Sequence, residues 1–281
     1  MANRPMTEAA PLAGLAVAVT RPARQNDALV QQLRALGASV SAIPLLAINP
    51  LQEPAQRAKI DTTLQQLADY QIAIFISQNA AEQVLLALAA RSLDWPSHIQ
   101  TYAIGSATTQ FLATNGISAT SPLQMNSEGL LALSALQNIA GQRCVIFRGL
   151  GGRETLAQTL RARGAVVDYC ELYCRQLPPE AGTQWSGWIA GLHTHSALVC
   201  INSTETLNHL CTIDPDAAAR NNLTLLVPGE RVARAASEAG FRHVGIANDA
   251  TDAAILHSAI LQAAISRTQR LHAATTGIRH D

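Results

Sequence analysis

Three stretches in the first half of this sequence return, in the same order, in the second half. The offset between each stretch and its copy is about 124–128 positions. Such a repeat predicts two similar structural units in one chain. The paired stretches are VAVTRPARQNDALVQQLRALGASV (17–40) and CVIFRGLGGRETLAQTLRARGAVV (144–167), IFISQNAAEQVLLAL (74–88) and LVCINSTETLNHLCT (198–212), and YAIGSATTQFLATNGI (102–117) and LLVPGERVARAASEAGF (225–241).

Short apolar runs alternate with segments of helical periodicity along the whole chain. This alternation is typical of βαβ units, and it predicts an α/β protein with two similar parallel-sheet domains of the Rossmann or flavodoxin kind. The predicted strands are 15–20, 39–47, 72–77, 100–105, 143–148, 165–175, 196–202, 223–227 and 243–247. The predicted helices are 24–36, 57–69, 79–91, 106–115, 127–138, 152–163, 182–191, 203–212, 230–239 and 251–270, with fraying expected from about Arg267.

Length and charge narrow the classes of function. The 281 residues have room for two domains of ordinary size, and the 20 basic residues are balanced by 20 acidic ones. This balance argues against a dedicated nucleic-acid binder, which usually carries a basic excess. Only Lys59 is a lysine, so the other basic residues are arginines, whose planar group suits carboxylates and phosphates but which also accumulate for genomic reasons.

The cysteines and the apolar runs indicate a cytoplasmic protein. The five cysteines form no C-x-x-C pair, and most lie in or beside apolar runs, as buried thiols of a reducing compartment do. The apolar run near the N-terminus is short and ends at Arg21, so we interpret it as a first strand rather than a signal peptide. No run reaches 18 apolar residues, so no membrane span is expected.

Clusters of polar residues follow several of the predicted strands, at the turn where the strand leads into the next helix. We call each such turn a polar corner. In an open parallel sheet, ligands bind outside the carboxyl ends of the strands, against helix N-termini. Ser, Thr and Asn are also the usual helix N-caps, so any single corner has a purely structural explanation. Repeated corners in both halves favour a shared anion-binding cleft. The residues that we expect there are Arg21, Ser77, Gln78, Asn79, Gly105, Ser106, Thr108, Arg148, Gly149, Ser203, Thr204 and Gly229.

Other chemical motifs are weaker. GLGGRE (149–154) resembles the start of a dinucleotide fingerprint, with Asp168 downstream, but Glu154 occupies the position of the third glycine and would oppose a pyrophosphate. His193 and His195 lack further ligands at metal-site spacing, so we expect a surface loop there. The sequence has no Walker loop and no nucleophile elbow. We therefore expect no metal and no cofactor, and a protein that binds a ligand or catalyses mainly by positioning it.

A set of motifs occurs in a fixed order along about residues 15–265. The motifs are VTRP after the first strand, P-L-L-x-I at 44–48, FIS at 75–77, AIG-x-x-T at 103–108, RG-x-x-GR-x-x-L-x-x-x-L-x-x-x-GA at 148–165, ELYCR at 171–175 and GERVARAASEAGF at 229–241. In this order and spacing they resemble the uroporphyrinogen-III synthase family.

The resemblance implies a particular domain arrangement. Members of this family have two α/β domains joined by a two-stranded β-ladder, with the active site in the cleft between the domains. Here one domain would be 1–42 plus 177–281, and the inserted domain would be 49–170. The ladder would be 43–48 and 171–176, two segments that occupy equivalent places in the repeat.

The resemblance also implies a reaction. The substrate is hydroxymethylbilane, a linear tetrapyrrole with eight carboxylates, and the product is uroporphyrinogen III, formed with inversion of ring D and loss of water. Tyr173 matches the tyrosine proposed to help the hydroxyl leave. Ser77, Thr108 and Ser203 match binding positions. The enzyme would be a cyclising lyase, a monomer with no membrane or nucleic-acid partner and with transient contact to the bilane-forming enzyme before it.

Three arginines complete the predicted site, and one position differs from the family pattern. Arg21, Arg148 and Arg153 are candidate partners for substrate carboxylates. Many relatives carry a hydroxyl residue two places after the glycine that corresponds to Gly229, where this chain has Arg231 beside Glu230. The rival interpretations are a two-lobed α/β protein that binds a solute or effector without catalysis, and a nucleotide-dependent oxidoreductase that uses the GLGGRE motif.

Overall fold

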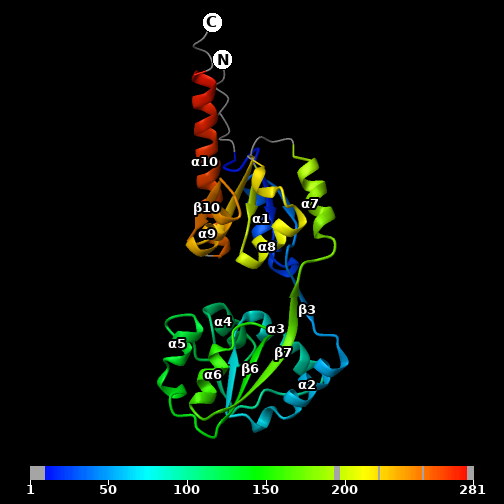
Figure 1. The fold of residues 1–281 in the computed structure, drawn as a ribbon, viewed down its shortest axis with the longest axis vertical. Helices are drawn as coiled ribbons and strands as arrows, with labels where there is room; N and C mark the ends of the chain where they lie inside the picture. Colours follow the sequence, from blue (N-terminus) through cyan, green and yellow to red (C-terminus); the bar gives the residue numbers. More distant parts are fainter. Residues whose placement is uncertain (1–9, 193–196, 221, 249, 277–281) are drawn as a thin grey trace, which may run out of the picture. The chain divides into compact units, whose positions relative to one another are not determined.

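The computed structural model describes residues 10–192, 197–220, 222–248 and 250–276 (Figure 1). The chain divides into two compact units. Unit 1 consists of residues 1–47 and 176–281, and unit 2 consists of residues 48–175. The chain therefore leaves unit 1, builds the whole of unit 2, and returns, crossing the boundary in the third strand and at the end of the seventh.

Unit 2 is built on a five-stranded sheet in the order β3-β7-β6-β4-β5. The pairs β7·β6, β6·β4 and β4·β5 are parallel. Its strands are β3 (Ala47–Pro50), β4 (Ile72–Phe75), β5 (Gln100–Ala103), β6 (Arg143–Gly149) and β7 (Val166–Gln176). Its α-helices are α2 (Pro54–Gln65), α3 (Gln78–Ala89), α4 (Ser106–Thr114), α5 (Ser127–Leu131) and α6 (Thr155–Ala162).

Unit 1 is built on a second five-stranded sheet, in the order β10-β9-β8-β1-β2, and its paired strands are all parallel. Its strands are β1 (Ala16–Val19), β2 (Ser39–Ala42), β8 (Ala197–Cys200), β9 (Leu223–Pro228) and β10 (Val244–Ala247). Its α-helices are α1 (Asp27–Ala35), α7 (Ala181–Ala190), α8 (Thr204–Ile213), α9 (Glu230–Glu238) and α10 (Asp252–Thr276). Helix α10 continues past the point where we predicted fraying.

The internal repeat is reproduced in the topology of the two sheets. The repeat pairs β1 with β6, β2 with β7, β8 with β4, and β9 with β5. Accordingly, the order β9-β8-β1-β2 in unit 1 matches β5-β4-β6-β7 in unit 2. Both units are mixed α/β with parallel sheets, which confirms the predicted fold class.

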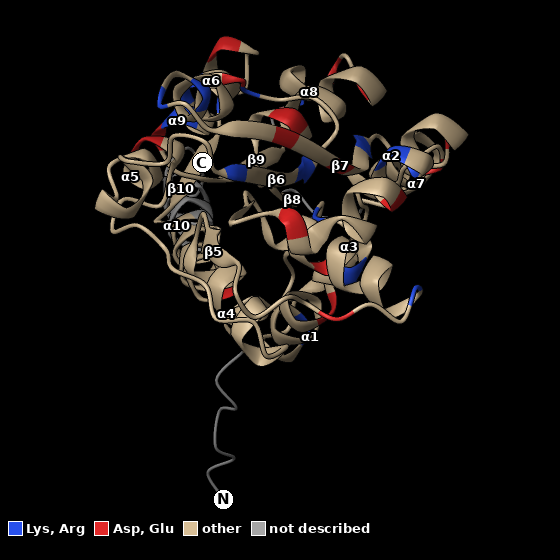
Figure 2. Cartoon of the chain, turned by 90° about the horizontal axis from the view of Figure 1, so that it is seen from below, with Lys and Arg blue, Asp and Glu red and all other residues tan. Residues whose placement is uncertain are grey.

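Helices cover both faces of each sheet. In unit 2, Val84 of α3 and Leu112 of α4 join one buried apolar cluster, while Leu160 of α6 joins the other. In unit 1, Trp185 of α7 lies in one cluster and Leu29 of α1 in the second. The strands are apolar on both faces because both are buried in this way. Charged residues are few, and most of the ribbon in Figure 2 is uncharged.

The predicted strand 39–47 is wrong in one respect, because it is two strands, β2 and β3, separated by four residues. Pro44 lies in the gap and has no N–H group to donate to a neighbouring strand. The flanking amides of Ile43 and Leu45 donate to carbonyl oxygens of Val19 and Thr20, at 2.9 and 3.0 Å. These bonds keep the segment on unit 1 until β3 begins beside β7.

Candidate functional site

A hollow of about 350 Å³ lies at the carboxyl edge of the unit 2 sheet. Ile76 and Ile104, which directly follow β4 and β5, contribute to its wall, together with the ends of β6 and β7 and the start of α5. This is the edge where open parallel sheets bind ligands. Four residues of the predicted site line the hollow, namely Arg148, Gly149, Arg153 and Tyr173.

Tyr173 lies in the wall of this hollow with its ring packed into the core. The residue is only 3% exposed and belongs to the same apolar cluster as Phe75 and Phe147. The phenol is held 3.0 Å from the hydroxyl of Ser77.

An irregularity between β6 and β7 places the ring of Tyr173. Arg148 pairs with Glu171, but the next residue, Gly149, pairs with Tyr173, so Leu172 is skipped in the register. The ring then lies directly over Gly149, where an added Cβ atom would come within 2.7 Å of the ring's Cε2 atom. Gly149 is therefore required by the close approach of an aromatic ring.

Ser77 is the N-cap of α3. Its backbone is extended, with φ −161° and ψ 159°, and its Oγ atom accepts the N–H of Ala80 at 3.2 Å. Serine is a favoured residue here because its oxygen satisfies an amide that has no partner within the helix. The same oxygen also bonds to the Tyr173 phenol. The exposed Gln78 and the half-buried Asn79 are the first residues of the helix.

Arg148 is buried, and its guanidinium group organises the loop that follows β6. The group donates to carbonyl oxygens of Gly149, Gly151 and Arg153, and lies 3.3 Å from the carboxylate of Glu154. It also stacks over the ring of Tyr169, with 4.6 Å between its carbon and the ring centroid. These contacts use most of its donors within the protein.

Arg153 differs from Arg148 in its surroundings. It is exposed at the rim of the hollow, and its guanidinium group makes no hydrogen bond or ion pair with any residue that the structure describes. The residue is therefore the better candidate for a substrate carboxylate. Arg175, two residues after Tyr173 on β7, also lines the hollow, and sequence reasoning missed it. The ELYCR motif contained it, and the period of two along a strand could have found it.

The corner at Gly105 has a conformational requirement of its own. Gly105 has φ 100° and caps α4 without a side chain, a conformation that glycine adopts without strain. Ser106 begins α4 and is exposed. Thr108 is buried, and its hydroxyl donates to the carbonyl oxygen of Ile104 at 3.3 Å. Thr108 therefore presents no unpaired hydroxyl donor at this corner.

In unit 1, the corner after β8 repeats the geometry of Ser77. Ser203 has φ −159° and ψ 163°, caps α8 and accepts the N–H of Thr206 at 3.1 Å. Its Oγ atom lies 2.9 Å from the hydroxyl of Thr206. Thr204 is the first residue of α8, and Gly229 caps α9 with φ 100°, as Gly105 does in unit 2.

Arg21, the counterpart of Arg148 in the repeat, is also held internally. It is buried, pairs with the carboxylate of Asp252 at the start of α10, and donates to the carbonyl oxygen of Ala250. Both strand-end arginines thus bond to their own unit, and neither is an open anion site. Glu230 begins α9, and the neighbouring Arg231 is exposed.

The dinucleotide interpretation finds no support in the geometry. The carboxylate of Glu154 pairs with Arg148 and accepts the phenol proton of Tyr169 at 2.7 Å. Asp168 pairs with residues near the amino end of the sheet, accepting the hydroxyl of Tyr70 at 2.8 Å. Neither acid is placed for a ribose or a pyrophosphate.

No group of three or more potential metal ligands occurs among the residues that the structure describes. His193 and His195, which we weighed as a metal pair, lie outside those residues. Within the same residues, no helix has the length and apolar character needed to cross a membrane.

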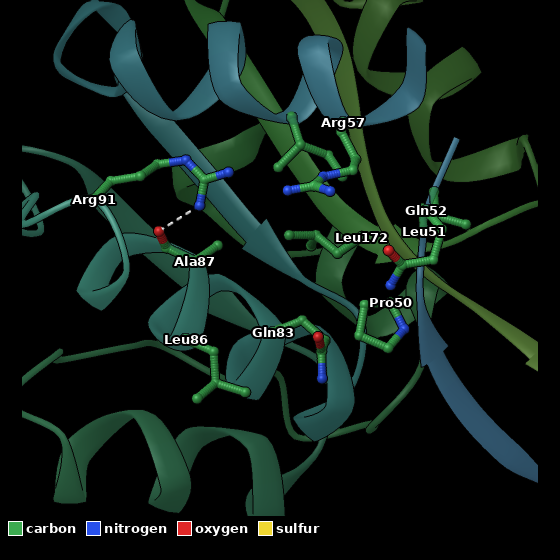
Figure 3. A pocket seen from close by; sticks show the side chains of 10 residues that line it. Pro50, Leu51, Gln52, Arg57, Gln83, Leu86, Ala87, Arg91 and Leu172 are labelled. Carbon is green, nitrogen blue, oxygen red and sulfur yellow. Dashed lines mark hydrogen bonds between the residues drawn. The ribbon is translucent and has the colours of Figure 1, made fainter. Parts of the chain in front are cut away.

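A second hollow, of about 310 Å³, lies between α2, α3 and the start of the chain segment after β3 (Figure 3). Leu86 and Leu172 give it apolar walls, and Arg57 points toward it from α2. Arg91 is tied to Asp61 and to the carbonyl oxygen of Ala87. None of the predicted site residues lines this hollow, and we assign no function to it.

The fold and the first hollow define a two-domain α/β protein with a candidate small-molecule site at the ends of parallel strands. The family model for uroporphyrinogen-III synthase HemD matches residues 27–257. The chain belongs to the uroporphyrinogen-III synthase family, as the motif resemblance had indicated.

Curated relatives and solved structures agree with this assignment. Uroporphyrinogen-III synthase from Salmonella typhimurium strain LT2 is 33% identical over 253 residues, which cover 87% of this chain and 99% of that protein. The Escherichia coli K12 protein of the same name is 34% identical over 250 residues, with the same shares covered.

Two solved structures share the fold. A mutant uroporphyrinogen III synthase from Thermus thermophilus superposes with a TM-score of 0.61 at 17% identity, covering 91% of this chain and 99% of that chain. The uroporphyrinogen-III synthetase from Helicobacter pylori 26695 gives 0.57 at 13% identity, covering 88% and 99%. At these identities the likeness establishes the fold alone.

Proposed function

We propose that this protein is a uroporphyrinogen-III synthase, a cyclising lyase of tetrapyrrole biosynthesis. It converts hydroxymethylbilane to uroporphyrinogen III, inverting ring D and releasing water. The family assignment and the relatives at 33–34% identity over most of the chain support this activity. The single observation that ties it to this molecule is Tyr173 in the wall of a hollow that three arginines, Arg148, Arg153 and Arg175, also line.

The proposed chemistry requires a proton donor and a shaped site, and we assign Tyr173 and the hollow to these two tasks. When the terminal hydroxyl of the bilane leaves, it takes a proton from the Tyr173 phenol and departs as water. The remaining azafulvene is attacked by the pyrrole ring through a spiro intermediate, which inverts ring D. Final closure releases one proton, which restores the phenol, so that the overall change is loss of one water.

The walls of the hollow suit a chain of pyrroles. Ile76, Ile104, Ile146 and Leu156 provide apolar surface for the rings. Arg153, with no partner among the described residues, supplies a cation for a propionate or acetate. The electron-rich pyrroles close unaided to the isomer with ring D not inverted, so the protein's task is to hold the bilane so that the spiro route is faster.

The remaining predicted contacts belong to the same proposal. We assign the helix N-termini that follow Ser77, Gly105, Ser203 and Gly229 to substrate carboxylates. An anion at an exposed helix N-terminus gains about 0.3–1 kcal/mol, so several such contacts would hold a polyanion without one indispensable residue. Glu230 in the first turn of α9 weakens this assignment at Gly229.

Product analysis tests the proposed function. The purified protein is incubated with freshly made hydroxymethylbilane, and the uroporphyrinogen isomers are separated after oxidation to the porphyrins. We expect isomer III from the enzyme and isomer I from a buffer control. The rival solute-binding protein would leave the isomer I product of spontaneous closure unchanged, and that result would refute the proposal.

We further propose a cytoplasmic monomer that receives its substrate through transient contact with the bilane-forming enzyme. All five cysteines are free. Burial raises the pKa values of the Cys144, Cys170 and Cys200 thiols to about 12, which disfavours the reactive thiolate. Such thiols suit a reducing compartment. Light scattering, with and without the partner enzyme, measures the oligomeric state directly.

A further inference from the structure

We infer that Ser77 and Gly149 are positioning residues for the Tyr173 phenol. The Ser77 hydroxyl acts on the reaction through this phenol, whereas the substrate carboxylate assigned to this helix N-terminus contacts backbone amides. This inference rests on the proposed function, because it assigns the phenol as the proton donor to the departing hydroxyl.

The first positioning feature is the register irregularity between β6 and β7 at Gly149. Because Leu172 is skipped, Tyr173 faces a residue without a side chain, and its ring lies against the backbone of β6. The amide of Leu150 donates to the carbonyl oxygen of Tyr173 at 2.7 Å, which fixes the backbone on the same side. An added methyl at position 149 would meet the ring atoms Cε2, Cζ and Cδ2 at 2.7, 2.9 and 3.2 Å. The ring would have to move, and its hydroxyl with it.

The second positioning feature is the hydroxyl of Ser77. A serine hydroxyl has one proton to donate and two lone pairs to accept with. The amide of Ala80 already donates to this oxygen at 3.2 Å, so the serine proton is free to point toward the phenol oxygen, 3.0 Å away. In that arrangement Ser77 is the donor and Tyr173 the acceptor. The phenol then keeps its own proton, which the proposed function assigns to the departing hydroxide.

The equivalent serine of unit 1 provides an internal comparison. Ser203 caps its helix with nearly the same backbone angles, but the second contact of its Oγ atom is the neighbouring Thr206 in the same helix. Helix capping therefore explains the hydroxyl of Ser203, but it does not explain why Ser77 also contacts a tyrosine from a distant strand.

A double-mutant cycle tests this assignment in the full-length protein. Ser77→Ala should lower kcat about three- to tenfold, with little change in KM, because one hydrogen bond to the phenol is lost. Ser77→Gly should lower kcat equally, although glycine is a much better N-cap than alanine. Ser77→Thr, which keeps a hydroxyl and a cap, should restore most of the rate.

The cycle is completed in the Tyr173→Phe background. There, Ser77→Ala should change kcat less than twofold, because the group through which it acts has already been removed. Additive losses of kcat in the two backgrounds, or a rise in KM as the main effect of Ser77→Ala, would overturn the inference. A Ser77→Ala variant with a much lower kcat than Ser77→Gly would also overturn the inference, because the loss of kcat would then follow the strength of the helix N-cap.

Gly149→Ala gives an independent measurement. In the wild-type background it should lower kcat at least tenfold, because the ring and its hydroxyl are displaced. In the Tyr173→Phe background it should destabilise the fold to the same extent and yet leave kcat nearly unchanged. Equal kcat losses in both backgrounds would contradict a role through the phenol.

A spectroscopic readout separates this inference from the proposed function. The chain has four tyrosines, so ¹³C labelling of the tyrosine Cζ atom yields four signals. The signal absent from Tyr173→Phe belongs to Tyr173. It should move in Ser77→Ala and stay in place in the matched cap variant Ser203→Ala. If the Tyr173 signal does not move in Ser77→Ala, the inference is overturned, even if the enzyme is active. If wild-type protein makes only isomer I, the proposed function is overturned, even if the signal moves.

Discussion

Tyr173→Phe is the substitution that separates catalysis from packing most cleanly. It removes one oxygen atom and keeps a ring that lies over Gly149 and within the apolar cluster of unit 2. The lost contact is a single 3.0 Å hydrogen bond, and the Ser77 oxygen keeps its second partner, the amide of Ala80. No buried group is left without a partner, so the free energy of unfolding should fall by only about 1 kcal/mol.

The effect on catalysis should be much larger than the effect on stability. A positioned general acid is typically worth at least 10²-fold, so kcat should fall by about 10²-fold, equivalent to about 2.7 kcal/mol of transition-state stabilisation. Slow turnover gives spontaneous closure time to compete. The product should therefore contain isomer I beside isomer III, and the share of isomer I should rise as the enzyme concentration is lowered.

The assay follows consumption of hydroxymethylbilane and resolves the porphyrin isomers at several enzyme concentrations. Urea unfolding of the same samples supplies the stability comparison. Tyr173→Ala is the matched control, since it also removes the ring and should lower both stability and activity. A Tyr173→Phe variant with normal kcat and pure isomer III would remove the phenol from the mechanism and leave Tyr173 as a packing residue.

Three further outcomes are expected. Arg153→Gln should raise KM about two- to fivefold with kcat unchanged, because an exposed guanidinium contact contributes about 0.2–1 kcal/mol to binding; steady-state kinetics that show a fall in kcat alone would contradict this. Ser203→Ala should likewise cost only part of the activity, since backbone amides remain at the helix N-terminus, and complete loss of turnover in a folded variant would reveal a dedicated catalytic hydroxyl. Burial opposes ionisation of Asp214, but hydrogen bonds from Arg220 at 2.9 Å and Trp185 at 2.7 Å outweigh it and lower the pKa of Asp214. A carboxyl group with a lowered pKa in the folded state stabilises above its unfolded pKa of about 3.9 and loses this contribution as the pH falls through the folded pKa. Asp214→Asn should therefore be less stable than wild type at pH 7 and lose less stability on acidification to pH 3, which thermal unfolding measures; equal pH dependence in the two proteins would contradict the argument.

The sequence was sufficient to predict the fold class because the repeat and the strand–helix alternation are both dictated by burial. Parallel strands covered on both faces must be apolar throughout, so each appears as a short apolar run between amphipathic helices. The one wrong strand, 39–47, shows the limit of this reasoning. Apolar residues continue on both sides of Pro44, but the strand ends at Ala42 and the next one begins only at Ala47. The apolar pattern alone cannot show which of the two sheets a residue joins.

The site was harder to predict because a residue type does not reveal which partner it will find. Arg21 and Arg148 have the charge expected of carboxylate ligands, yet each bonds to its own unit. Arg21 pairs with Asp252, far along the chain, and Arg148 bonds to the loop that follows β6, as far as Glu154. Thr108 has a suitable hydroxyl, but the helix carbonyl at Ile104 accepts its proton. These outcomes depend on contacts several residues away or across the sheet, which local sequence patterns do not contain.

The two copies of the polar corner now have different explanations. Both Ser77 and Ser203 cap a helix in the same way, so the capping alone accounts for the repeated sequence. The repeat that pairs 17–40 with 144–167 also pairs Pro22 with Gly149 and Leu46 with Tyr173. Unit 1 thus has neither the phenol nor the glycine that makes room for it, although it keeps the cap. Duplication supplied two helix N-termini able to face an anion, and we propose that only the unit with a tyrosine opposite its serine acquired the proton donor.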